Sequence, residues 1–277
     1  MTRNKIAFAT CVTLGRSCIE KILELGGTLD LLITLKDDIA PDKSGRVYID
    51  DIAQKNNIPL IKIKNINEEE VLRAIKEHKI DYFFVIGWSQ IVKSELLSAP
   101  KKACLGMHPT LLPEGRGRAA IPWAIIKGLE KTGVTMFKLD EGVDTGDILG
   151  QIEIPIDQST TATELYEKVN SAHTSLIEKY WDSIAGDSVS LTKQDESRAT
   201  VWEGRKPQDG EIFSTMSKIE ADRLVRAVTH PYPGAFFTKD NKKVIIWSAK
   251  VSDIPEENSI ALSDGYLIPI EFEETEL

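Results

Sequence analysis

The chain has 277 residues, of which 42% are hydrophobic and 28% charged; this is an ordinary globular composition and excludes a disordered or collagen-like protein. Its formal net charge of -9 argues against a protein that binds by neutralising the phosphates of a nucleic acid. The length predicts one large domain with a small appendage, or two modest domains.

The cysteines and the N-terminus indicate the compartment. Cys11, Cys18 and Cys104 are odd in number and lack metal-type spacing, so we expect reduced thiols rather than disulfides. A strand-like run begins at Ile6, which leaves no space for a leader, and no apolar run reaches the roughly 20 residues that span a bilayer. We therefore expect a cytoplasmic protein that uses neither a membrane nor a metal.

Short apolar runs alternate with helical patterns through the first half of the chain. Strands separated by helices imply crossover connections and a mainly parallel sheet covered on both faces, which is a Rossmann-like α/β fold. The expected strands are 6–10, 29–35, 59–63, 82–86, 104–107 and 134–139, and the expected helices are 14–25, 48–56, 68–79 and 119–127.

The second half begins with a long amphipathic helix over 162–184, and Thr161 and Glu164 have the spacing of a capping box at its start. From about residue 204 the pattern changes to short strand-like runs, such as 243–248 and 266–270, with one helix over 217–228. We predict a catalytic domain over 1–203 and a small, mostly β domain over 204–277. The acidic end, 271–276, is expected to be a solvated terminus.

Ligands of open α/β sheets bind beyond the carboxyl ends of the strands, so the loops that start at Gly87, His108 and Asp140 are the expected walls of a site. His108 follows a buried strand and precedes Pro109, which favours an extended turn that leaves the imidazole at the edge of the sheet. Position alone favours a catalytic and a structural role equally. The remaining histidines are interpreted as surface, packing or turn residues: His78, His173 and His230.

Asp144 lies in an acidic loop, 140–147, whose two glycines permit tight backbone geometry close to a ligand. In isolation a solvated turn is the simpler interpretation, and the spacing does not match a calcium-binding EF-hand. A carboxylate next to His108 would orient the ring and favour its protonated form, as in an acid–base pair.

Several large enzyme classes are excluded by missing motifs. No Gly-x-Gly-x-x-Gly follows the first strand, which argues against a dinucleotide cofactor. Phosphate loops of the Walker type, the Gly-x-Ser-x-Gly elbow and His-Glu-x-x-His are also absent from the sequence.

An ordered set of motifs resembles the folate-dependent formyltransferases, the family of glycinamide ribonucleotide transformylase, methionyl-tRNA formyltransferase and the sugar N-formyltransferases. The run 108–113, His-Pro-Thr-Leu-Leu-Pro, and Arg-Gly-Arg-Ala at 116–119 with Trp123 are similar to the family's His-x-Ser-Leu-Leu-Pro and Arg-Gly-Arg-Ala-Pro. The loop 140–146 resembles the folate-binding loop with its essential aspartate. The tail resembles the second domain shared by the tRNA and sugar enzymes at 205–210, 224–227 and 231–236.

The resemblance implies N10-formyltetrahydrofolate as the formyl donor and a neutral amine as the acceptor. His108 would stabilise the tetrahedral oxyanion or carry the amine proton, and Asp144 would hold the histidine tautomer. A surface position for Arg118 is nearly as well supported as a binding role. The implied donor-binding residues are Gln90, Ile91, Val92, Thr110, Arg118, Asp140, Glu141, Val143 and Asp144.

One departure from the family concerns the oxyanion. The family has an asparagine two residues before the histidine, where it hydrogen-bonds the formyl oxygen, and this chain has Gly106. Because one oxyanion donor is worth about 3 kcal/mol, another group must replace it or the rate must fall. Ser89 is the candidate catalytic donor, and a backbone N–H or a water is the alternative. A non-catalytic folate or nucleotide-binding protein is the third interpretation.

The acceptor is predicted from charge and length. From Arg205 onward the chain carries 9 Lys and Arg against 13 Asp and Glu, which disfavours tRNA. Glycinamide ribonucleotide transformylase would not need the tail. We therefore expect a nucleotide-linked amino sugar as the small-molecule partner, ahead of methionyl-tRNA, and a second copy of the chain in a homodimer.

Overall fold

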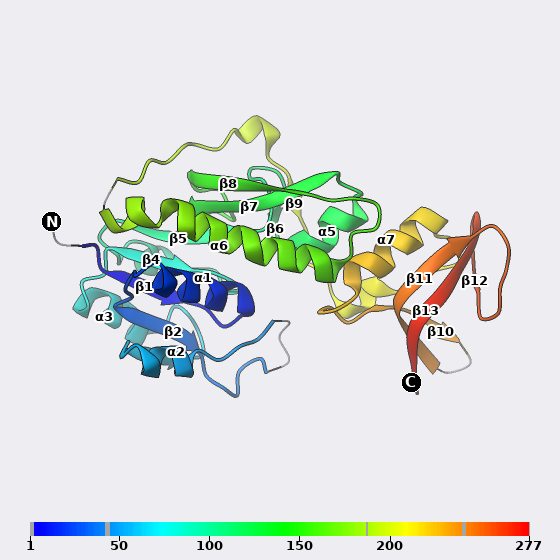
Figure 1. Ribbon diagram of the computed structural model, residues 1–277, viewed down its shortest axis with the longest axis horizontal. Coiled ribbons are helices and arrows are strands. Elements are labelled where there is room, and N and C mark those ends of the chain that lie inside the picture. The colour runs from blue at the N-terminus through cyan, green and yellow to red at the C-terminus, as the bar shows by residue number, and fades with distance from the viewer. Residues whose placement is uncertain (1–2, 42–44, 187, 240–241, 277) are drawn as a thin grey trace. The chain divides into compact units, whose positions relative to one another are not determined.

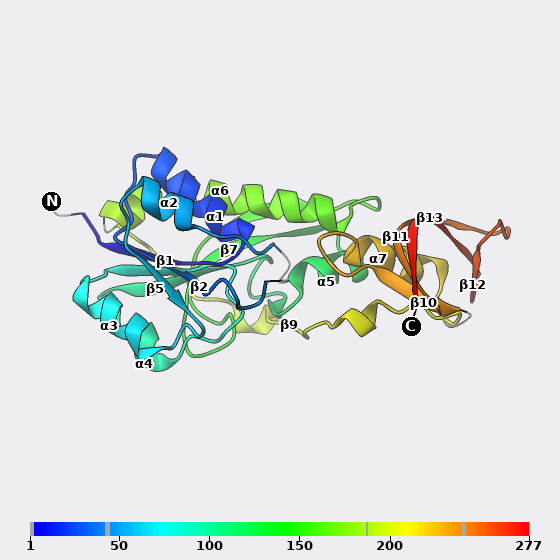
Figure 2. The ribbon, with the colours of Figure 1, turned by 90° about the horizontal axis from the view of Figure 1, so that it is seen from below.

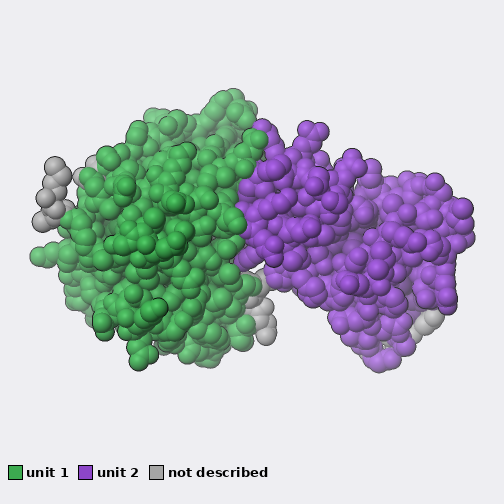
Figure 3. Space-filling model, viewed as in Figure 1, with its two compact units in different colours: residues 1–116, 133–153, 169–201 green, residues 117–132, 154–168, 202–277 purple. Residues whose placement is uncertain are grey.

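The structure is a computed structural model that describes residues 3–41, 45–186, 188–239 and 242–276 (Figure 1). The chain forms two compact units, 1–116 with 133–153 and 169–201, and 117–132 with 154–168 and 202–277 (Figure 3). Each unit draws on several stretches of the chain. The expected division at residue 204 stays a prediction.

A seven-stranded sheet organises the first unit, with strand order β3-β2-β1-β4-β5-β7-β8. The pairs among β1 to β5 are parallel, and β7 runs antiparallel to β5. The strands are β1 Ile6–Ala9, β2 Leu31–Leu35, β3 Leu60–Ile63, β4 Tyr82–Val85, β5 Ala103–His108, β7 Lys131–Lys138 and β8 Ile148–Pro155. The helices of this half are α1 Thr13–Glu24, α2 Asp50–Lys55, α3 Glu69–Glu77, α4 Ser94–Leu97 and α6 Ala162–Gly186. The predicted Rossmann-like, mainly parallel fold is confirmed.

Helices cover both faces of this sheet: α1 and α6 lie on one face, and α3 and α4 on the other (Figure 2). Neighbouring residues of a strand point to opposite faces, so the central strands are apolar throughout. Phe8 stacks on Phe84 with ring centroids 5.3 Å apart, whereas Phe83 packs in the cluster that contains Val71 and Ile75 of α3. The sheet is thus a rigid, doubly buried platform whose strand ends carry the site.

The second unit contains a four-stranded antiparallel sheet of order β10-β11-β13-β12, against which α7 packs. Helix α7 also contacts α5. The small, mostly β second part predicted from the tail is confirmed. Its elements are α5 Ala120–Ile126, η2 Pro207–Gly210, α7 Lys218–Val228, β10 Ala235–Lys239, β11 Lys242–Ser252, β12 Ile260–Leu262 and β13 Gly265–Glu276. A two-stranded sheet pairs β6 Arg116–Gly117 with β9 Val201–Trp202, after the short η1 Glu196–Arg198.

Two local features go beyond what the sequence predicts. The strand β8 was not expected, because Gly150 interrupts its apolar pattern; in the fold this glycine admits the ring of Tyr180 from α6. The acidic end is exposed as predicted, but it is extended and pairs with β11, and Lys242 contacts Glu274 at 3.0 Å. Opposite charges on facing strands let an acidic segment complete a sheet.

The predicted start of the long helix is confirmed. The backbone N–H of Thr161 donates to Glu164 at 2.8 Å, and the N–H of Glu164 donates to the Thr161 hydroxyl at 3.3 Å. Within the described part of the chain, no helix combines the length and apolar character that crossing a membrane requires.

Replacing Gly150 with alanine should destabilise the protein. A Cβ atom there would lie 2.2 Å from the Tyr180 hydroxyl oxygen, so the ring must move, and overpacking of this kind costs about 1–3 kcal/mol. Urea unfolding measures the loss. Gly186→Ala, at the end of α6 with nothing within 4 Å of the added atom, is the matched control. Equal effects of the two changes would contradict the contact.

Candidate active site

His108 is the last residue of β5, and only 8% of it is exposed. Its Nε2 lies 2.8 Å from the carbonyl oxygen of Gly115, which can only accept, so Nε2 carries a hydrogen. Its Nδ1 lies 3.5 Å from a carboxylate oxygen of Asp144. Both ring nitrogens therefore face acceptors. The two residues that the sequence paired are brought together.

The route of Asp144 to the histidine differs from the expected one. Because β7 is antiparallel to β5, Thr135 lies opposite His108, and the loop after β7 starts beside Cys104 instead of at the carboxyl edge. The loop must therefore turn back to deliver Asp144. It contains internal bonds: Asp140 accepts from the N–H of Gly142 at 3.1 Å and from the hydroxyl of Thr145 at 2.7 Å.

The backbone of Asp144 has φ of 56°, in the left-handed region that costs a residue other than glycine about 1 kcal/mol. The side-chain amide of Gln194 offsets this cost, since its Nε2 donates to the carbonyl oxygens of Asp144 and Gly146 at 2.8 and 2.7 Å. Gln194 thus holds the main chain of Asp144, while the side chain of Asp144 faces His108.

Two side chains of the sheet, Thr135 of β7 and Gln151 of β8, hold the loop after His108. The hydroxyl of Thr135 donates to the carbonyl of Thr110 at 2.7 Å and accepts from the N–H of Leu112 at 3.0 Å. Gln151 of β8 donates to the carbonyl of Leu112 at 2.8 Å and to the Thr135 hydroxyl at 2.9 Å. A buried polar network of this kind leaves the loop a single conformation.

Thr110 has a property expected of a ligand-binding residue. It is 2% exposed, and its hydroxyl oxygen has no hydrogen-bond partner among the described residues. An unpaired buried hydroxyl costs about 1–3 kcal/mol, so a bound molecule that pairs with it gains affinity.

The space that the family asparagine would occupy is filled by a neighbouring side chain. A Cβ atom built on Gly106 would lie 2.7 Å from the Cδ2 atom of Leu139, so the leucine occupies the space of a larger side chain. Ser89, the candidate replacement donor, is exposed in the loop after β4. Its catalytic role stays a prediction.

The other expected donor-binding residues differ in availability. The amide oxygen of Gln90 accepts from the N–H groups of Ile66 and Trp88 at 2.8 and 3.1 Å, and its nitrogen donates to the carbonyl of Lys64 at 2.9 Å. Its side chain thus holds a neighbouring loop. Among the rest, Val92 is buried, Ile91 and Val143 are 72% and 53% exposed, and Glu141 and Arg118 are exposed. Arg118 belongs to the second unit.

Three side chains near the pair, Arg116, Gln194 and Glu196, were not expected as site residues. Arg116, 5% exposed, donates to Glu196 at 2.6 and 2.9 Å and to the amide oxygen of Gln194 at 2.7 and 3.2 Å. The bond to Glu196 raises the pKa of Arg116, so the guanidinium stays charged. Arg116 was visible only as part of a motif. Gln194 and Glu196 lie in a polar stretch with no local pattern, and no sequence signal marks them.

His173 of α6 was expected to be a surface or packing residue, and it is a packing residue. It is 1% exposed, and its Nδ1 donates to the carbonyl of Val169 at 2.8 Å. Burial lowers the pKa of His173 to about 4, and the nearby charge of His108 adds to the lowering. The ring is therefore neutral at pH 7.

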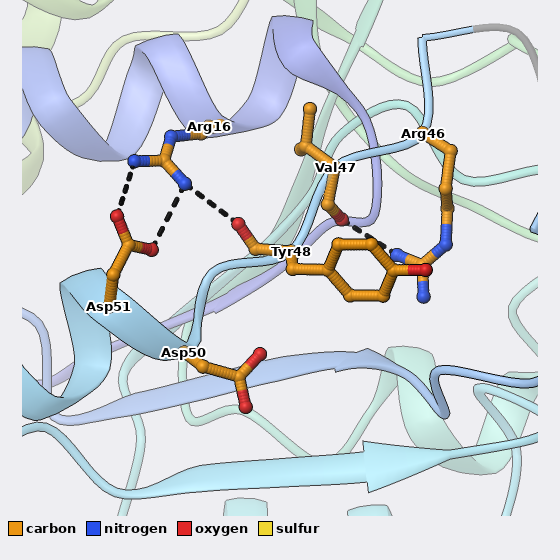
Figure 4. A pocket seen from close by; sticks show the side chains of 6 residues that line it. All are labelled: Arg16, Arg46, Val47, Tyr48, Asp50 and Asp51. Carbon is orange, nitrogen blue, oxygen red and sulfur yellow. Dashed lines mark hydrogen bonds and ion pairs between the residues drawn. The ribbon is translucent and has the colours of Figure 1, made fainter.

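A separate pocket of about 610 Å³ is lined by Arg16, Arg46, Val47, Tyr48, Asp50 and Asp51 (Figure 4). Several of its charged groups already have partners: Arg16 contacts Asp51 at 2.6 Å, Asp50 contacts Lys62 at 2.6 Å, and the guanidinium of Arg46 lies 4.7 Å from the ring centroid of Tyr48. The expected site residues do not line it, so it carries no assignment. The described residues include no group of three His, Cys, Asp or Glu side chains arranged to hold a metal ion.

Two family models match the chain. The model of the formyl transferase family matches residues 25–179, and the model of the formyl transferase C-terminal domain matches residues 205–269. The chain belongs to the formyl transferase family. The resemblance found in the motifs around His108 and Asp144 is thereby confirmed.

Individual relatives of this formyltransferase differ in name and in length. Methionyl-tRNA formyltransferase of Lachnospira eligens is 28% identical over 255 residues, covering 91% of this chain and 81% of that protein. The bifunctional polymyxin resistance protein ArnA of Wigglesworthia glossinidia brevipalpis is 31% identical over 239 residues, covering 86% of this chain and 36% of that protein. The chain therefore spans about a third of the bifunctional relative.

Solved structures share the fold at lower identity. The N-formyltransferase of Helicobacter canadensis, in complex with folinic acid and dTDP-3-aminofucose, superposes with a TM-score of 0.72 at 20% identity and covers 98% of this chain and 100% of its own. The methionyl-tRNA formyltransferase of Clostridium thermocellum gives a TM-score of 0.66 at 21% identity, with 99% of each chain covered.

Introducing the family asparagine as Gly106→Asn should destabilise the protein by about 1–3 kcal/mol, because Leu139 fills the space. Leu139→Ala should relieve much of this loss, so the double variant should be more stable than the sum of the two single changes predicts. Urea unfolding of the four proteins measures the coupling. Strict additivity would show that the leucine does not occupy the asparagine position.

His173 should make stability depend on pH. The pKa of His173 is lowered from 6.5 to about 4, so between these values the unfolded chain binds more protons, and stability is complete above pH 6.5 and lost as the pH falls. Between pH 7 and pH 5 the protein should lose about 2 kcal/mol more than His173→Gln, which keeps a donor for Val169. Urea unfolding at both pH values measures this difference. Equal losses would exclude His173 as the titrating group.

Proposed function

We propose that this formyltransferase moves a formyl group from N10-formyltetrahydrofolate to the amine of a nucleotide-linked amino sugar. The observation that carries the enzyme assignment is the buried ring of His108, with Gly115 on one nitrogen and Asp144 on the other. A non-catalytic binding protein would not need both ring nitrogens faced by acceptors in this way.

The ring of His108 can exchange a proton and can stabilise the negative charge that develops during acyl transfer. The 2.8 Å bond from Nε2 to Gly115 fixes the ring, so Nδ1 is the atom that can exchange a proton. Nδ1 lies 3.5 Å from a carboxylate oxygen of Asp144, so the carboxylate can orient the ring. A ring held in a fixed position can stabilise negative charge that develops beside it during acyl transfer. The donor supplies the electrophilic formyl carbon.

A folate donor fits the residues that are present. The unpaired, buried hydroxyl of Thr110 offers a hydrogen bond at the loop next to His108, and Val143 offers an exposed apolar surface beside Asp144. Structural neighbours support this assignment, since they were solved with folinic acid, 5-N-formyltetrahydrofolate and tetrahydrofolic acid. Gln90, Ile91, Val92, Arg118, Asp140 and Glu141 remain proposed members of the donor site.

The sugar acceptor is supported by charge and by the structural neighbours. The acidic tail, with 13 Asp and Glu against 9 Lys and Arg, does not supply the field that attracts tRNA. Proteins that superpose on nearly the whole chain include a sugar 3N-formyltransferase and the enzyme bound to dTDP-3-aminofucose. Methionyl-tRNA is the second candidate. Two relatives that are 28% and 31% identical to this chain are methionyl-tRNA formyltransferases, and the match covers 81% of each of them. A homodimer in the cytoplasm stays a prediction.

An acceptor panel should identify the substrate. With N10-formyltetrahydrofolate labelled in its formyl carbon, we expect label to enter nucleotide-linked 3-amino or 4-amino sugars and not methionyl-tRNA. His108→Ala and Asp144→Asn should each lower kcat by at least about 100-fold, because acid–base groups contribute that much. Mass spectrometry of the products measures the transfer, and thermal unfolding confirms that the variants are folded.

The outcomes separate the candidates. Label in methionyl-tRNA alone would replace the sugar by the second candidate. Binding of folate without formylation of any amine would favour the non-catalytic protein. Unchanged turnover in both variants would refute the roles of His108 and Asp144.

A further inference from the structure

The segment 194–200 contacts both sides of the His108–Asp144 pair, and we infer that Gln194 is its central positioning residue. This inference rests on the proposed catalytic role of the pair. It concerns residues that lie between the two family matches, which end at residue 179 and begin again at residue 205. The segment therefore belongs to neither of the two matched regions.

On the Asp144 side, Gln194 acts through the main chain. Its Nε2 donates to the carbonyl oxygens of Asp144 and Gly146, and so spans the residue whose φ of 56° is unfavourable. Without this donor the Asp144 carbonyl loses the hydrogen bond from Gln194, and the loop gains access to conformations in which the carboxylate leaves the histidine. Gln194 thus restricts the direction in which the Asp144 side chain points.

On the Gly115 side, Thr200 acts in the same way. Its hydroxyl accepts from the N–H of Gly115 at 2.8 Å, and its carbonyl accepts from the N–H of Arg116 at 2.9 Å. The carbonyl of Gly115 is the group that accepts from His108. One stretch of chain therefore holds the acceptors on both nitrogens of the ring.

Arg116 joins the two ends and fixes the orientation of the glutamine amide. A guanidinium only donates and a carbonyl only accepts, so the amide oxygen must face Arg116 and the nitrogen must face Asp144 and Gly146. The amide cannot be flipped without losing four contacts. A glutamate at this position would set a carboxylate oxygen against two carbonyl oxygens.

The kinetic test compares Gln194→Met with Gln194→Glu. Methionine keeps the length and volume of the side chain but cannot donate, and glutamate keeps the acceptor for Arg116 but repels the carbonyls. Both should lower kcat by about 10-fold or more and leave the KM of the formyl donor within about threefold, because misplacing an acid–base group lowers the chemical step. Gln158→Ala, at an exposed glutamine, is the control and should match the unchanged protein.

A double-variant comparison shows whether Gln194 acts through Asp144. In the background of Asp144→Asn, adding Gln194→Met should lower kcat by less than about twofold, since residues that act as one unit are not additive. A full additional loss in the double variant would overturn the inference. A rise of about 10-fold in the KM of the formyl donor with kcat unchanged would also overturn it.

A spectroscopic readout needs no acceptor amine, so it distinguishes failure of this inference from failure of the proposed function. In protein labelled with ¹⁵N-histidine, Asp144→Asn should shift the ring signals of His108, and Gln194→Met should shift them in the same direction. The signals of His78 and His230 should stay in place. An unchanged His108 signal in folded Gln194→Met, when Asp144→Asn moves it, would overturn the positioning role even if the acceptor proves not to be a sugar.

Discussion

The hydrogen bond from the His108 ring to the carbonyl of Gly115 is the constraint on which the rest of the site depends. It fixes one ring nitrogen, and so decides that the other must face Asp144. A ring held on both sides has one preferred orientation, which the proposed stabilisation of charge beside it requires. The loops around the pair can be understood as devices that keep these two acceptors in place.

Those devices are built from neutral polar side chains more than from charges. Thr135 and Gln151 hold the loop after His108 from the sheet, whereas Gln194 and Thr200 hold the loops of Asp144 and Gly115. Buried amides and hydroxyls have fixed donor and acceptor roles, so each one specifies a single arrangement. Arg116 is the buried charge of this network, and Glu196 with Gln194 satisfies it.

Gly106 shows how the chain departs from its family without losing the fold. A glycine in a buried strand leaves room, and Leu139 fills that room with an apolar side chain. The strand therefore keeps its packing, while the amide side chain that the family pattern has at this position is absent. Packing of the core requires only that the volume at this position is filled. The proposed chemistry requires a hydrogen-bond donor at a defined place.

The sequence by itself determined the α/β platform and most of its strands and helices, because hydrophobic periodicity is a property of neighbouring residues. His108 and Asp144 were singled out by the resemblance of their motifs to a family, since position alone left a structural role equally open for His108. The tertiary structure alone decided that β7 is antiparallel and that the Asp144 loop turns back to the histidine. It also decided that a polar segment some 50 residues after Asp144 holds that loop. Contacts between distant residues leave no periodic trace, since they depend on strand direction and on which side chains the fold brings together.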